Sequence, residues 1–187
     1  MIHVGLDARI VQDGNYEDFE VGKEYRLALE FYPIEVAIAC NTSTGPVLSH
    51  LGNACYEARG TVTFCNDLAW VVDFGVPAFQ KTKPPEKVKL GDPVSGRFYI
   101  SVDPLLYVDD LKNEKGMPDL YRHWIIRRIL LETTPRQDST DAHGRKITSR
   151  DVTRESFAEI PVTDAWHHDG GNGHYVLECE LNKNPTA

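Results

Sequence analysis

Three histidines lie close together near the end of the chain, in the segment Trp166-His167-His168-Asp169-Gly170-Gly171-Asn172-Gly173-His174. Histidine and carboxylate side chains bind zinc and other transition metals, and histidine transfers protons near neutral pH. The segment also contains the turn formers of a hairpin tip. The register of that hairpin decides whether these side chains can act together.

Two registers remain open for this hairpin. A five-residue turn sets His168 opposite His174 and Asp164 opposite Glu178, so that two imidazoles and two carboxylates share one face. The candidate metal ligands in this register are His168, His174, Asp164 and Glu178.

The alternative is a two-residue turn at Asn172-Gly173, a strong hairpin signal. Trp166 then faces Cys179, and two apolar rows share one face: Tyr175, Leu177, Cys179 and Leu181 with Ile160, Val162 and Trp166. Burial of one large apolar side chain stabilises a fold by about 2–3 kcal/mol. We therefore favour this register, which scatters the histidines, and we predict no cofactor.

A second group of candidate residues lies in an apolar segment at 120–131. It contains the pair Arg127-Arg128 and the aromatic residues Tyr121 and Trp124. In a regular strand one arginine points to each face, and an inward arginine needs an acidic partner or lines a cavity. The candidate ligand-binding residues are Arg127, Arg128, Trp124 and Tyr121.

Common catalytic motifs are absent from the sequence. It contains no G-x-S-x-G, G-x-x-x-x-G-K-[ST], H-E-x-x-H or G-x-G-x-x-G. The leading hypothesis is therefore a non-catalytic binding protein. An enzyme that holds a small anionic substrate in a polar barrel cavity is the alternative.

Length and composition indicate a single domain over residues 1–187, with 26% charged and 41% hydrophobic residues. The N-terminal residues do not resemble a signal peptide, and no apolar run has membrane-spanning length, so we expect a cytoplasmic protein without a membrane partner. The four cysteines, Cys40, Cys55, Cys65 and Cys179, have no metal-site spacing and are expected to be buried free thiols.

Charge is unevenly distributed along the chain, whose net charge is −8. Residues 1–80 and 151–187 are acidic, whereas residues 81–150 carry 14 basic and 10 acidic side chains. Overall acidity disfavours nucleic-acid binding and favours a basic protein partner. Single-strand nucleic-acid binding by the basic middle remains a third hypothesis, since aromatic and basic residues alternate there.

Short apolar/polar alternations separated by turn residues recur along the chain, beginning with a predicted strand from Ile2 to Ile10. Gly60 inside one such pattern predicts a bulge or a close backbone approach. We also predict a short helix from Pro104 to about Asn113, a strand at 120–131 and a long polar loop at 133–150. The segment Gly91-Asp92-Pro93-Val94-Ser95-Gly96-Arg97-Phe98 resembles a strand of OB-type barrels.

The predicted fold class is therefore mostly β, an antiparallel barrel or sandwich, OB-like, with one short helix. Such a protein most naturally recognises another protein. A small-molecule ligand and a homo-oligomer are further possibilities.

Overall fold

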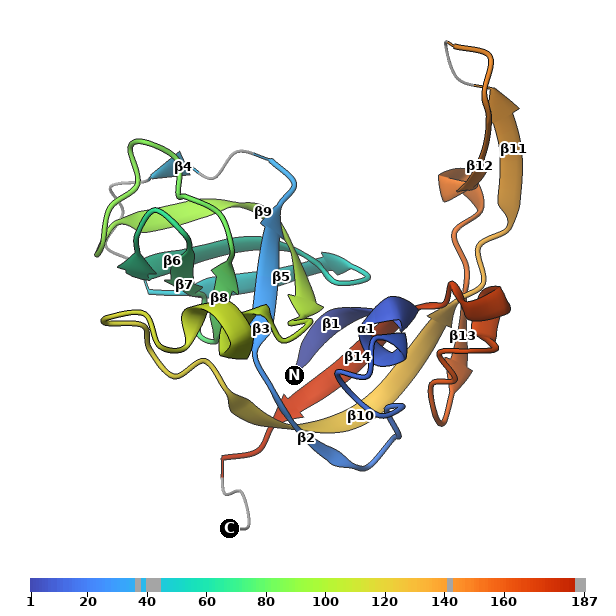
Figure 1. The fold of residues 1–187 in the computed structure, drawn as a ribbon, viewed down its shortest axis with the longest axis horizontal. Helices are drawn as coiled ribbons and strands as arrows, with labels where there is room; N and C mark the ends of the chain where they lie inside the picture. Colours follow the sequence, from blue (N-terminus) through green and yellow to red (C-terminus); the bar gives the residue numbers. More distant parts are fainter. Residues whose placement is uncertain (36–37, 40–44, 141–142, 184–187) are drawn as a thin grey trace.

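The computed structural model describes residues 1–35, 38–39, 45–140 and 143–183 and confirms a mostly β fold (Figure 1). Strands account for 50% and helices for 10% of the structure, which contains a closed five-stranded barrel with further sheets around it. The strands are β1 (Ile2–Asp7), β2 (Glu24–Leu27), β3 (Leu29–Pro33), β4 (Ile38–Ala39), β5 (Val47–Gly52), β6 (Cys55–Cys65), β7 (Trp70–Asp73), β8 (Pro77–Gln80), β9 (Pro93–Val102), β10 (Arg122–Glu132), β11 (Arg136–Thr140), β12 (Lys146–Arg150), β13 (Phe157–Ile160) and β14 (His174–Leu181).

The barrel closes in the cyclic order β3, β8, β7, β6 and β9. The pairing of β3 with β8 is parallel and the other pairings in the ring are antiparallel, so the barrel is mixed. The segment that resembles an OB-type strand runs into β9, which is one of the barrel strands.

Aromatic side chains fill the barrel. The Phe31 ring lies edge-on to Trp70 and Phe98, with centroid distances of 4.8 and 5.6 Å. Gly60 makes the predicted close approach, because a Cβ atom there would lie 2.5 Å from the Asp73 carbonyl oxygen. The missing side chain at Gly60 thus lets β6 and β7 approach each other closely in the wall of the small barrel.

A second sheet lies beside the barrel in the order β13, β10, β14 and β1, with β2 paired to part of β10. It joins the barrel through one parallel bridge, Gly5 to Ser101, between β1 and β9. The strand predicted at 120–131 is confirmed as β10. A β-bulge between Ile126 and Arg128 explains why its apolar residues follow no single alternation.

The helical segments differ from the prediction. The first strand ends at Asp7, whose side chain caps the short helix α1 (Ala8–Gln12) by accepting a hydrogen bond from the Arg9 amide. The helix predicted from Pro104 to about Asn113 is present as a short π-helix, Tyr107–Leu111. Leu105 has a φ of 68°, and this left-handed conformation prevents a helix from starting at Pro104.

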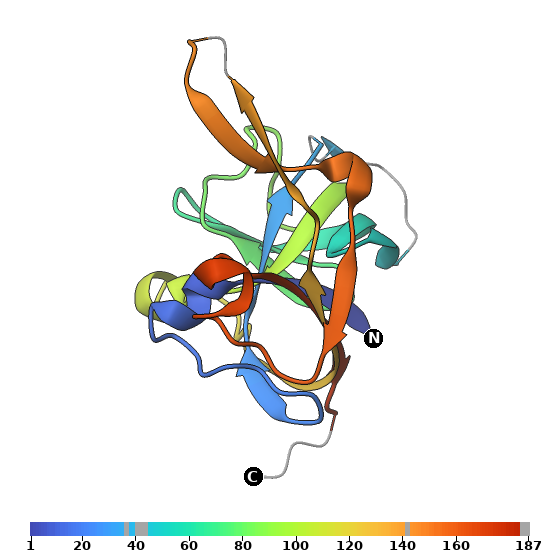
Figure 2. The same cartoon turned by 90° about the vertical axis from the view of Figure 1, so that its right-hand side faces the viewer.

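Residues 133–150 are not the predicted loop. Strands β11 and β12 pair only with each other, and they form a ribbon that projects from the rest of the molecule in both views (Figure 1 and Figure 2). We call this ribbon, Arg136–Arg150, the arm. Its strands are exposed on both faces and contain a single large apolar residue, Ile147, so apolar alternation could not reveal them.

Both registers predicted for the C-terminal hairpin are wrong. Strand β14 pairs with β1 on one side and β10 on the other, so no edge is left for a preceding hairpin strand. Strand β13 pairs with β10 instead. Trp166, expected in the core, is 64% exposed in the connection.

The described cysteines Cys55, Cys65 and Cys179 are free thiols, of which Cys179 is buried as expected and the other two are partly buried. Cys40 lies outside the described residues. Among the described residues, no helix has the length and apolar character needed to cross a membrane.

Candidate functional site

The four candidate metal ligands do not come together. His168 accepts a hydrogen bond from the Asp164 amide at Nδ1, whereas the Asp164 carboxylate contacts His167 at 2.8 Å. His174 lies near Asp7. Glu178 contacts His3 and Arg128. No cluster of three metal-binding side chains exists among the residues that the structure describes.

The two arginines of β10 both lie on the surface. Arg127 occupies the bulge and donates to Glu180 at 2.7 Å. Arg128 donates to Glu159 at 2.7 Å and to Glu178 at 3.1 Å. The bulge breaks the alternation of side chains, so the expectation that one arginine points inward is wrong.

The aromatic candidates also lie apart from the arginines. Trp124 is buried, and its indole N–H has no hydrogen-bond partner among the described residues. Tyr121 is partly buried and stacks under the Arg26 guanidinium, 4.3 Å from its ring centroid. The candidate ligand-binding residues therefore do not surround one cavity.

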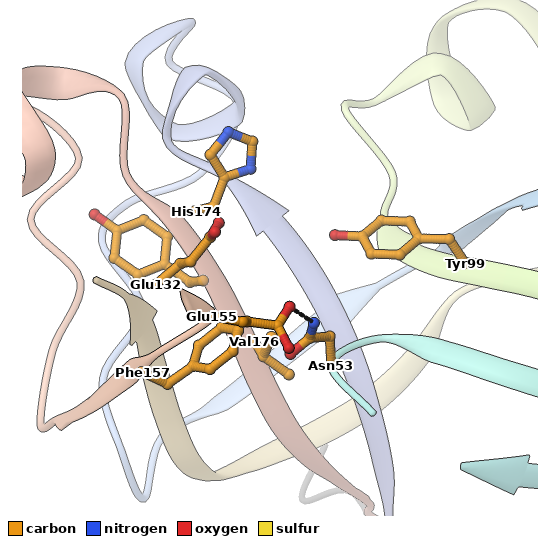
Figure 3. Close-up of a pocket in the computed structure, with 8 residues that line it drawn as sticks. Asn53, Tyr99, Glu132, Glu155, Phe157, His174 and Val176 are labelled. Carbon is orange, nitrogen blue, oxygen red and sulfur yellow. Dashed lines mark hydrogen bonds between the residues drawn. The ribbon is translucent and has the colours of Figure 1, made fainter. Parts of the chain in front are cut away.

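A different set of residues lines a pocket of about 220 Å³ between the barrel and the second sheet (Figure 3). The barrel side contributes Asn53, from the β5–β6 turn, and Tyr99, from β9. The opposite side is formed by residues at the ends of strands and in their connections: Glu132, Glu155, Phe157, His174, Tyr175 and Val176.

Tyr99 reaches across the pocket from the barrel towards Glu132 and His174 (Figure 3). Its ring lies against β1 at Gly5, where a Cβ atom would be only 1.8 Å from the hydroxyl oxygen. Burial raises the pKa of Tyr99 to about 12, and the charges of Asp7 and Glu132 act in the same direction. The hydroxyl therefore stays protonated at neutral pH in a negative environment.

Glu132 is held in place at the base of the arm. Its carboxylate lies 3.2 Å from Arg150 Nε, and both side chains are less than 20% exposed. Arg150 and Arg136 also contact the Asp169 carboxylate, at 2.7 and 2.6 Å. This network fixes the arm to the second sheet beside the pocket.

Glu155 closes the other end of the pocket. Its carboxylate accepts a hydrogen bond from the Asn53 side chain, which joins the connection before β13 to the β5–β6 turn of the barrel (Figure 3). His174 lies on the opposite side, with Nε2 3.5 Å from Asp7. Carboxylates therefore lie at both ends of the pocket, and Phe157 and Tyr175 add aromatic surface.

This arrangement suits a cationic group. Glu155 accepts a neutral hydrogen bond from Asn53, and Glu132 shares Arg150 with Asp169, so the site keeps negative charge. Aromatic faces attract cations through their quadrupole. Sequence reasoning found only His174 of the pocket residues. Apart from Tyr175 and Val176, which follow His174 directly, the others come from distant segments that only the pairings of β1 and β10 with their neighbours bring together.

No family model, curated protein or solved structure matches this chain significantly.

Proposed function

We propose that the protein is a non-catalytic binding protein that recognises a basic protein partner. Its pocket between Tyr99 and Glu132 receives one lysine or arginine side chain of that partner. The observation that carries the proposal is the combination of two carboxylates and three aromatic side chains in one small pocket.

The size of the pocket supports a side chain rather than a metabolite. Pockets for drug-sized ligands span about 300–1,000 Å³, whereas this one encloses about 220 Å³. A lysine or arginine side chain is a narrow apolar stem with a charged end, which suits a small opening with the poorly exposed Glu132 on one side and the exposed Glu155 at its rim.

Charge supports a basic partner as well. The net charge of −8 attracts basic surfaces over a distance and accelerates their association. It equally disfavours an anionic substrate. The arginines that would have held such a substrate are exposed and paired with Glu180, Glu159 and Glu178.

The test is the binding of a fluorescent octalysine peptide, with an octaglutamate peptide as the control for charge sign. We expect the variant Glu132→Gln/Glu155→Gln to bind octalysine at least about tenfold more weakly, a loss of about 1.4 kcal/mol. The matched control is Glu159→Gln/Glu180→Gln, which removes the same charge outside the pocket and is expected to bind as the wild type does.

Equal losses in the two variants would reject the pocket, because the attraction would then come from overall charge. Failure of the wild type to bind octalysine at low salt would reject the proposed partner class. Binding of octaglutamate instead would favour the alternative in which the protein holds an anion.

A further inference from the structure

We propose that the protein forms a twofold-symmetric dimer in which strand β5 pairs antiparallel with β5 of a second copy. This interface is independent of the pocket. It follows from the free edge of β5, from its lack of charge and from the order of its side chains.

Strand β5 lies outside the barrel ring, next to the barrel strand β6, and is the last strand on that side. It pairs with β6 along one side, and no strand that the structure describes pairs with its other side. An edge strand presents unpaired backbone N–H and C=O groups, which form hydrogen bonds readily with another strand. Antiparallel pairing with a second copy would extend the sheet across both molecules.

The other edges of the described sheets carry charges or are very short. Strand β2 has Glu24 and Arg26, and β13 has the exposed Glu159. Both strands of the arm also carry charged side chains, and β4 has only two residues. Charges and short length are common ways in which proteins prevent edge pairing.

Strand β5 carries no charge, and its protection against edge pairing is confined to a β-bulge near its end. Its sequence, Val-Leu-Ser-His-Leu-Gly, has no Asp, Glu, Lys or Arg. Val47 is 40% exposed and Leu51 is 52% exposed. A β-bulge between His50 and Gly52 ends the regular pairing, which leaves Val47–His50 as the regular part of the edge.

Charge favours this edge over others for contact between two copies. Each copy has a net charge of −8, so two copies repel wherever acidic surfaces meet. Pairing through β5 brings no formal charge opposite another. On β6, Glu57 and Arg59 lie beside Ser49 and Val47 and balance each other.

The order of side chains makes the strand self-complementary. A twofold axis at Ser49 places Ser49 opposite its own copy and Leu48 opposite His50. Beyond this regular pairing, Val47 of each copy approaches Leu51 of the other at the bulge, where these exposed apolar side chains come together. Cross-strand apolar pairs stabilise antiparallel sheets.

The experiment is sedimentation equilibrium of the full chain over a wide range of concentration, with the variants Ser49→Lys and Ser139→Lys. Lysine at residue 49 places two like charges opposite each other at the axis. We expect the dimer dissociation constant to rise at least about tenfold for this variant. Ser139→Lys, on the exposed arm, is the matched control and is expected to dimerise as the wild type does.

A monomeric wild type at all concentrations would overturn the proposal, and so would equal dimerisation of Ser49→Lys and wild type. If circular dichroism shows that Ser49→Lys is unfolded, Leu51→Lys replaces it with the same expectation. The axis is tested by Ser49→Cys, which should form an intermolecular disulfide faster than Val47→Cys, since only residue 49 faces itself. Equal rates would overturn the register.

Discussion

Gly5 and Tyr99 are in direct contact where the second sheet meets the barrel. A Cβ atom on Gly5 would lie 1.8 Å from the Tyr99 hydroxyl oxygen and 2.4 Å from Cζ. The contact lies beside the bridge from Gly5 to Ser101, which joins β1 to β9. A missing side chain on one strand thus creates the space in which Tyr99 extends into the pocket.

Replacement of Gly5 by alanine is expected to displace Tyr99. Forcing extra atoms into a packed contact costs about 1–3 kcal/mol, and the ring would leave its place in the pocket. We expect a lower urea midpoint and weaker octalysine binding for Gly5→Ala. Tyr99→Ala should relieve the clash, so Gly5→Ala should cost much less stability in that background. Equal costs in both backgrounds would show that the tyrosine is not the obstacle.

Arg127, in the β10 bulge, is expected to contribute little to stability. Exposed ion pairs are worth about 0.2–1 kcal/mol, and both Arg127 and its partner Glu180 are at the surface. Arg127→Ala should change the free energy of unfolding by less than about 1 kcal/mol. Ile126→Ala, in the core beside it, should cost about 2–5 kcal/mol in the same urea titration. A comparable loss in the arginine variant would contradict this surface assignment.

The fold class could be predicted because most strands alternate apolar and polar residues. β6 shows this most clearly, with Tyr56, Ala58 and Val62 buried between exposed neighbours. The arm could not be predicted in this way, since its strands bury neither face. At Arg127 a single extra residue reverses the alternation, and no local sequence signal marks it.

The C-terminal segment shows that a local turn signal does not determine which strands pair. Asn172-Gly173 is a strong turn signal, yet β14 finds both of its neighbours elsewhere in the chain, in β1 and β10. Long-range pairing therefore outweighs the turn preference. The pocket was missed for the same reason, because Tyr99 and Glu132 line one pocket only through the long-range pairing of β1 with β9 and β14.

Asp103 is expected to make stability depend on pH. It is fully buried, and burial raises its pKa to about 7, while backbone N–H groups of Tyr107 and Leu106 act in the opposite direction. Between the unfolded pKa near 4 and the folded pKa, only the folded state keeps the proton. The contribution of Asp103 to stability therefore falls as pH rises from about 4 to about 7, by about 1.4 kcal/mol per pH unit, and is constant above.

Asp103→Asn removes this titration and keeps an oxygen that can accept a backbone hydrogen bond. The stability of the wild type relative to Asp103→Asn should decrease from pH 5 to pH 8, as measured by urea midpoints. Burial also raises the pKa of Glu30, whose charge in turn raises the pKa of Asp103, so the comparison is repeated in the Glu30→Gln background. Parallel curves for the two proteins would mean that Asp103 is ionised throughout this range.

The arm is expected to be dispensable for folding, although its base is not. Its two strands pair only with each other, and their side chains are exposed except at Arg150. Because Arg136 and Arg150 lie opposite each other, an Asn-Gly turn can replace residues 137–149. This deletion should change the free energy of unfolding by less than about 1 kcal/mol. Arg150→Ala should cost about 1–3 kcal/mol, because it leaves the poorly exposed Glu132 carboxylate without its partner. Urea titrations that show a larger loss for the deletion than for Arg150→Ala would mean that the arm itself supports the fold.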